Sequence, residues 1–73
     1  MRAKINIDTL GKINNFVSIC SKFDCNIRLI DGADYCVSAK SVIGAVATMD
    51  WTEVFVVSDE DIYQHIQEFV VIE

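Results

Sequence analysis

The chain has 73 residues, of which 52% are apolar, and its net charge is −5 at pH 7. A chain this short forms one domain, here residues 1–73, and its apolar content excludes disorder, which requires low hydrophobicity and high charge. No apolar run approaches the roughly 20 residues that cross a bilayer, so we expect a cytoplasmic protein that does not contact a membrane.

The N-terminal part of the chain predicts a strand followed by a helix. Apolar and polar residues alternate over residues 2–7, as in a half-buried strand. Asp8 or Thr9 can then cap a helix by accepting a hydrogen bond from a free backbone N–H. Gly11 costs about 1 kcal/mol against Ala inside a helix, so we expect the helix to begin nearer Lys12. Its buried face is predicted from apolar residues at helical spacing, which are Ile13, Phe16, Val17 and Cys20.

A β-hairpin and a short helix are predicted next. Residues 26–30 and 35–39 each alternate between apolar and polar side chains, and the intervening Asp31-Gly32 is a strong hairpin signal. Ser41 can then cap a short helix over residues 42–47.

The C-terminal part predicts a turn around Trp51, a β-branched strand over residues 53–57 and a last helix over roughly residues 59–71. Ser58 and Asp61 have the spacing of a capping box, with Asp in place of Glu or Gln. The inward face of this last helix is predicted to consist of Ile62, Ile66, Phe69 and Val70.

The resulting order, β-α-β-β-α-β-α, predicts an α+β two-layer domain. Its helices can cover one face of a four-stranded antiparallel sheet and leave the other face open. If Val54 and Val56 point to the helices, Phe55 and Val57 face the open side, and Ile30 joins them. A large exposed apolar patch often marks an interface, such as a symmetric homodimer, although scattered apolar surface is also normal.

The chemistry-bearing residues form no catalytic or cofactor-binding pattern, so we expect neither enzymatic activity nor a cofactor. There is no Gly-rich phosphate loop and no nucleophile–His pair. The cysteines at positions 20, 25 and 36 lack the spacing of a zinc site or of a disulfide framework. We therefore interpret them as thiols and expect no metal.

The charges of the two parts of the chain differ. Residues 1–40 carry all six Lys and Arg against four acids, whereas residues 41–73 carry seven acids and no Lys or Arg. Nucleic acid requires a cationic surface, so we expect no nucleic-acid partner. An acidic surface of this kind can steer association with a basic patch on a protein.

Two short segments carry a resemblance to a known family. Ser21-Lys22-Phe23-Asp24 and Lys40-Ser41-Val42-Ile43-Gly44 are separated by a strand, a turn and a second strand. This arrangement resembles HPr, the small phosphocarrier of the bacterial sugar phosphotransferase system, and the similarity extends from about Asn15 to Val71. The resemblance implies the open-faced β-sandwich of that family, an HPr-like fold.

The residues that carry phosphate in HPr are missing from this chain. An HPr holds its phosphoryl group on a histidine in a Gly-Ile-His-Ala-Arg-Pro-like loop after the first strand. The corresponding residues 8–15 contain no His, Arg or Pro. The only histidine, His65, is expected in the last helix near Asp61 and Glu68, whose negative charge opposes a phosphoryl group. We interpret it as a solvated surface side chain.

The resemblance also implies candidate site residues. Ser41 matches the regulatory serine of the family, which makes it a candidate for regulatory phosphorylation, although an ordinary N-cap role explains the residue with no function at all. HPr proteins dock their partners on the surface around the first two helices. The candidate partner-binding residues are therefore Ile13, Asn14, Phe16, Val17, Ser41 and Val42.

The sequence therefore favours an HPr-like protein that lacks the histidine phosphocarrier site and acts as a protein-binding or regulatory module related to the phosphotransferase system. Its expected partners are proteins of that system or a serine kinase. Two alternatives remain open: a phosphocarrier with atypical chemistry, and a structural or oligomerisation domain without phosphate chemistry.

Overall fold

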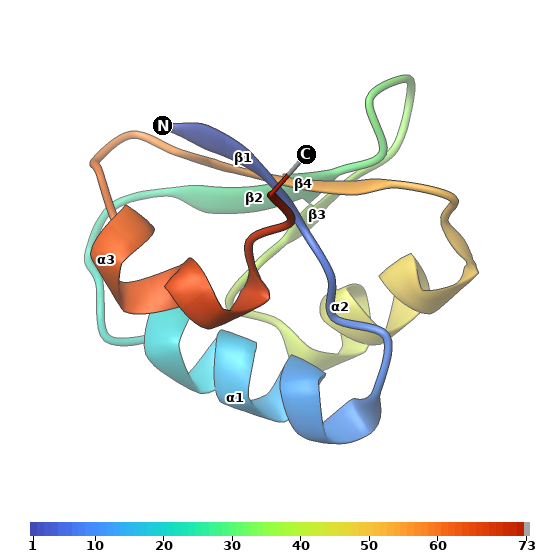
Figure 1. Cartoon of the computed structure of the whole chain (residues 1–73), viewed down its shortest axis with the longest axis horizontal. Coiled ribbons are helices and arrows are strands. Elements are labelled where there is room, and N and C mark those ends of the chain that lie inside the picture. The colour runs from blue at the N-terminus through green and yellow to red at the C-terminus, as the bar shows by residue number, and fades with distance from the viewer. Residues whose placement is uncertain (73) are drawn as a thin grey trace.

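The computed structural model describes residues 1–72, and the strands and helices follow one another in the predicted order (Figure 1). Two short 3-10 helices, η1 and η2, extend α2 and α3. The elements are β1 (Arg2–Ile5), α1 (Leu10–Cys20), β2 (Ile27–Ile30), β3 (Cys36–Ser38), α2 (Val42–Ala47), η1 (Thr48–Asp50), β4 (Val54–Ser58), α3 (Tyr63–Ile66) and η2 (Gln67–Phe69).

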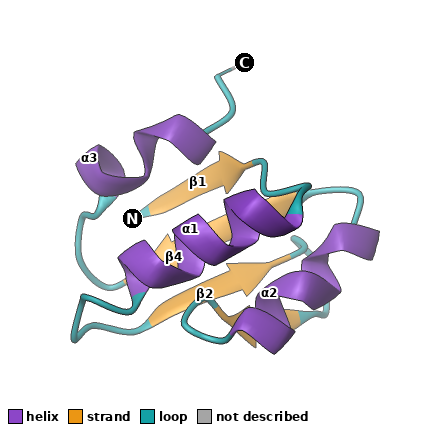
Figure 2. Cartoon of the chain, turned by 90° about the horizontal axis from the view of Figure 1, so that it is seen from below, coloured by secondary structure: helices purple, strands orange, loops and turns teal. Residues whose placement is uncertain are grey.

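The four strands form one antiparallel sheet in the order β1-β4-β2-β3. The helices lie together on one side of this sheet, as Figure 1 shows, and Figure 2 views the same layer with α1 crossing in front of the strands. Among residues 1–72, no helix covers the opposite side of the sheet. The predicted α+β architecture, an antiparallel sheet with helices on one face only, is therefore confirmed at the level of its layers.

The core lies between the helices and the inner face of the sheet. The α1 side chains predicted to face inward are all buried, because their helical spacing places them on one stripe. The rings of Phe16 and Phe69 meet edge to face with centroids 5.3 Å apart, which joins α1 to η2. The sheet contributes Ile5, Ile27, Leu29, Val54 and Val56 to the same cluster.

The start of α1 differs from the prediction. The helix begins at Leu10, so Gly11 lies within its first turn and not before it. The hydroxyl of Thr9 accepts a hydrogen bond from the backbone N–H of Lys12 over 3.2 Å, and the Thr9 carbonyl accepts one from Ile13 over 3.0 Å. This cap stabilises the first turn by about 1 kcal/mol, which offsets the cost of the glycine.

The last helix is much shorter than predicted. Residues Tyr63–Ile66 form α3 and Gln67–Phe69 continue as a 3-10 turn. Ser58 does not cap the helix, because it ends β4 as a buried residue and its hydroxyl donates to the Glu60 carbonyl. The Asp61 carboxylate accepts instead from the backbone N–H of Tyr63 over 3.0 Å. The predicted capping box is therefore wrong.

The chain after η2 pairs with the edge of β1. The N–H of Val71 donates to the Lys4 carbonyl over 2.9 Å, and the N–H of Asn6 donates to the Phe69 carbonyl over 2.8 Å. These bonds require extended backbone, which explains why the helix stops before residue 71. They also protect one edge of the sheet, since an unpaired edge strand exposes free N–H and C=O groups.

The β2–β3 turn is the predicted hairpin turn. A carboxylate oxygen of Asp31 accepts hydrogen bonds from the N–H groups of Ala33 and Tyr35, over 2.8 Å and 3.2 Å. Gly32 has φ +91°, a conformation that residues with a side chain rarely adopt. The turn therefore depends on the Asp-Gly pair that the sequence analysis identified.

Candidate functional site

Three of the candidate partner-binding residues belong to the core. Ile13 and Phe16 are 0% exposed and Val17 is 6% exposed, so no partner can reach them in the folded protein. The physical reason is that α1 has a single apolar stripe, and this stripe is needed to cover the sheet. The prediction that these three side chains bind partners is therefore wrong. Asn14, on the outer side of α1, is exposed.

Ser41 lies at the start of α2 and caps it. Its hydroxyl oxygen accepts a hydrogen bond from the N–H of Gly44 over 3.2 Å, and its carbonyl accepts from Ala45 over 2.9 Å. The residue is half-buried, with an extended backbone (φ −110°, ψ 121°) typical of an N-cap. The predicted capping role is confirmed.

The contacts of the neighbouring residues fix the position of this helix start. The ammonium group of Lys40 donates to the Phe23 carbonyl, which joins the loop before α2 to the loop after α1. An added Cβ at Gly44 would lie 3.3 Å from Val37 and 3.4 Å from the Ser38 carbonyl oxygen. Glycine therefore allows α2 to approach β3 closely.

Apolar side chains are exposed on α2, directly after Ser41, and on η1 at the other end of this segment. Val42 is 45% exposed, Ile43 is 86% exposed and Met49 in η1 is 45% exposed. In the six residues of α2, only Ala45 is buried. We call the exposed pair of Val42 and Ile43 the α2 surface. Val42 was among the predicted partner-binding residues, whereas Ile43 was not.

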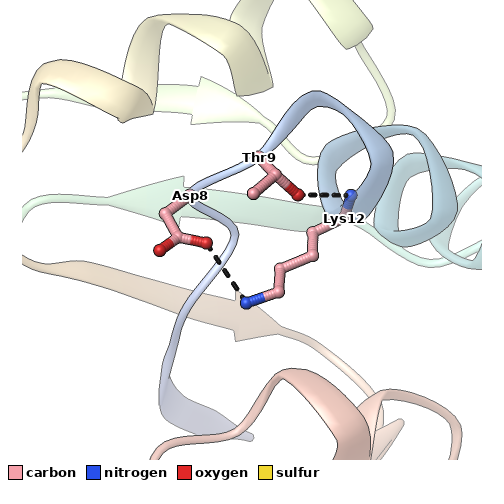
Figure 3. A network of polar contacts seen from close by, with 3 residues as sticks. All are labelled: Asp8, Thr9 and Lys12. Carbon is pink, nitrogen blue, oxygen red and sulfur yellow. Dashed lines mark hydrogen bonds and ion pairs between the residues drawn. The ribbon is translucent and has the colours of Figure 1, made fainter.

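The residues at the start of α1 form a local polar network. Figure 3 shows the ammonium group of Lys12 on the carboxylate of Asp8, at 3.1 Å, beside the Thr9 cap. All three residues are exposed. Asp8 neutralises the cation nearest the helix start, so an incoming phosphoryl group would meet a carboxylate there.

His65 lies far along the chain from that loop and is exposed on α3. Its ring meets the edge of the Phe23 ring at a centroid distance of 5.0 Å. The surface position agrees with the sequence interpretation, and the backbone N–H of His65 itself donates to the Ile62 carbonyl over 3.0 Å.

The cysteine side chains are free thiols in three different environments. Cys20 is buried, Cys25 is half-buried and Cys36 is exposed. Burial raises the pKa of the Cys20 thiol to about 12, because removal from water disfavours the thiolate more than the charge of Lys40 favours it. Within residues 1–72, no three His, Cys, Asp or Glu side chains are grouped as metal ligands would be.

The comparisons with known proteins identify no relative. No family model matches the chain, and neither the curated proteins nor the solved structures contain a significant match. Over the described part of the chain, none of the helices has the length and apolar character needed to span a bilayer.

Proposed function

We propose that this chain is an HPr-like module that binds proteins and has no histidine phosphocarrier site, related in function to the sugar phosphotransferase system. The order β-α-β-β-α-β-α and the sheet with one open face support an HPr-like fold. The segments that motivate the resemblance occupy the loop after α1 and the start of α2, and Lys40 joins these two regions. The module acts in the cytoplasm, where free thiols are stable.

The observation that carries the proposal is the exposure of Ile43. Its side chain is 86% exposed, although it lies in the first turn of α2, the helix that Ser41 caps. An exposed apolar side chain on an ordered helix favours docking, because burying it releases water at no further cost in backbone order. The adjacent Val42, which is 45% exposed, enlarges the apolar area available to a partner.

The absence of a phosphoacceptor from the loop after β1 supports a binding role over a carrier role. Residues 8–15 contain no histidine, and the ion pair between Asp8 and Lys12 lies where a phosphoryl group would have to be held. A carrier with atypical chemistry would need another acceptor at this helix start, and Thr9 already uses its hydroxyl as the cap.

Regulation at Ser41 is part of the proposal. A phosphoryl group adds close to two negative charges at neutral pH. At Ser41 these charges would stand next to the exposed Val42 and Ile43, where they would oppose the docking of an apolar partner surface. Phosphorylation would therefore switch the α2 surface off for such a partner.

The test uses an HPr-type serine kinase with ATP, and an ordinary HPr as the positive control. We expect phosphorylation of the unmodified chain at Ser41 and none of Ser41→Ala. Ile43→Lys should slow the reaction at least about tenfold, because it places a charge in the docking surface. Ile72→Lys is the matched control, since Ile72 is also an exposed isoleucine, at 89%. An unmodified chain beside a fully modified HPr would refute the proposal, as would equal losses in the two lysine variants.

A further inference from the structure

The helix-free face of the sheet combines cationic with apolar side chains. The strand register places Arg2, Val57 and Arg28 in one row across β1, β4 and β2. It places Lys4, Phe55 and Ile30 in the next row across the same three strands. We call these six residues the open face. Phe55 and Val57 alternate along β4 with the buried Val54 and Val56, so they point away from the helices. The other four residues are paired with them in the register and therefore point to the same side.

The charge of this face is opposite to that of the whole chain. The chain carries −5, yet the open face holds three cations, and Glu53 is bound to one of them, Lys4, at 3.4 Å. Arg2 and Arg28 both stand beside Val57, in the strands on either side of β4. Neighbouring strands are about 4.8 Å apart, so the two arginines are separated by roughly 10 Å at the backbone.

Arg2 is already oriented on this surface. Its guanidinium carbon lies 4.8 Å from the centre of the Phe55 ring, the distance of a cation–π contact. A guanidinium held over a ring keeps its N–H edge free for a carboxylate, and less side-chain entropy is lost on binding. The Gly32 turn also lies close to the Phe55 ring.

These features disfavour two kinds of occupant for the open face, which are a second copy of the chain and a single-stranded nucleic acid. A second copy placed face to face would bring the cations of one sheet against those of the other. Single-stranded nucleic acid needs an exposed aromatic ring for base stacking, whereas Arg2 lies over the Phe55 ring. The acidic remainder of the chain would also repel its phosphates.

We propose that the open face binds an acidic amphipathic helix of a partner protein, with carboxylates on Arg2 and Arg28 and apolar side chains on Val57 and Ile30. Residues seven positions apart on a helix lie on one side, about 10 Å apart along its axis, which matches the backbone separation of the two arginines. The side chains three and four residues after the first carboxylate then lie between them, above Val57. This site is separate from the α2 surface, which belongs to the helix layer.

The probe is a fluorescent helical peptide of about 15 residues, held helical by a covalent bridge on its far side. It carries Glu at positions i and i+7 and Leu at i+3 and i+4. A second peptide of the same composition carries the two Glu on the side opposite the leucines. We expect saturable binding of the first peptide, binding at least about tenfold weaker of the second, and weakening with added salt.

Two charge reversals on the protein locate the site. Arg28→Glu should weaken binding of the first peptide at least about tenfold, since it repels the carboxylate that Arg28 attracts. Lys22→Glu changes the net charge equally at an exposed position after α1, and should alter binding less than about threefold. Arg28→Gln, which perturbs the sheet less, should give an intermediate loss. Ile43→Lys should bind the peptide as the unmodified chain does, which separates this proposal from the function of the α2 surface.

The proposal would be overturned if the two peptides bound equally well, or if Arg28→Glu and Lys22→Glu had equal effects on binding in folded protein. Tighter binding of an oligothymidine than of the first peptide would show instead that the face binds nucleic acid. A dimer of the unmodified chain that becomes stronger in Arg28→Glu would show that a second copy occupies the face. Circular dichroism of each variant establishes that it is folded.

Discussion

The two helix starts of this domain, at Thr9 and at Ser41, have the same cap and different surroundings. In each, a hydroxyl oxygen accepts a hydrogen bond from the N–H three residues later, over 3.2 Å. Thr9 begins a helix of 11 residues that buries a full apolar stripe, and its neighbours Asp8 and Lys12 form an ion pair. Ser41 begins a helix of six residues that buries only Ala45.

The difference shows that capping residues alone do not identify a functional helix start. Both caps follow from local chemistry, in which a hydroxyl satisfies a free N–H. What distinguishes the two is the side chains that remain exposed beside them. After Thr9 one apolar side chain, Leu10, is 60% exposed beside the ion pair of Asp8 and Lys12, whereas after Ser41 both Val42 and Ile43 are exposed, Ile43 at 86%. The larger exposed apolar area favours a partner surface at the second start.

The largest expected effect concerns the side chains of the two helices. Phe16→Ala on α1 should lower the free energy of unfolding by about 3–5 kcal/mol, because it leaves a cavity in the core. Ile43→Ala on α2 should change it by less than about 0.5 kcal/mol, since the side chain is exposed. Urea unfolding of both variants measures the difference. Similar losses in the two variants would contradict the assignment of one helix to the core and the other to a surface.

A second effect sharpens the description of α1 as a buried helix. Cys20 ends its stripe, and its raised pKa keeps the thiol protonated, so it should react with a thiol reagent at pH 8 at least about a hundredfold more slowly than the exposed Cys36. Stability should fall as the pH rises above 9.0, where the unfolded thiol ionises while the folded one stays neutral until about 12. Peptide mapping after timed labelling identifies each cysteine. Comparable rates would contradict the burial of Cys20.

A third, smaller effect compares the two caps directly. Thr9→Ala and Ser41→Ala should each cost about 1 kcal/mol, whereas Ser41→Asp should keep most of the stability because its carboxylate can also accept from the N–H of Gly44. Thermal unfolding monitored by circular dichroism gives these values. If Ser41→Ala were neutral, the serine would not act as a cap.

The smallest effect is expected at the ion pair beside Thr9. Lys12→Met should change the stability by less than about 0.5 kcal/mol, because both partners are exposed, at 47% and 64% of the side chain. The same unfolding experiment at low and high salt tests this. A loss of more than about 1 kcal/mol would indicate that the pair organises the loop more strongly than an exposed pair should.

Local patterns in the sequence predicted much of the fold. Alternation in residues 53–57 predicted that Val54 and Val56 face inward, and helical spacing predicted the buried stripe of α1. Asp31-Gly32 predicted the hairpin turn through the geometry that glycine allows. Each of these signals depends only on residues close together in the chain.

Features that depend on distant residues were not predicted. The last helix is short because the chain after Phe69 pairs with β1, and this contact between the two ends leaves no local signal. The exposure of Ile43 follows from where α2 packs against β3. The sequence of α2 does not predict this exposure, because it contains several apolar residues that are equally suited to face inward. The cationic rows of the open face required the register of three strands.

The most direct test of the proposed function counts phosphoryl groups by intact-mass spectrometry after two separate treatments. One sample receives Enzyme I with phosphoenolpyruvate, and the other receives an HPr-type serine kinase with ATP. The account predicts no phosphoryl group in the first sample and one, on Ser41, in the second. An acid-labile group in the first sample that disappears in His65→Ala, or no group in the second beside a fully modified HPr, would contradict it.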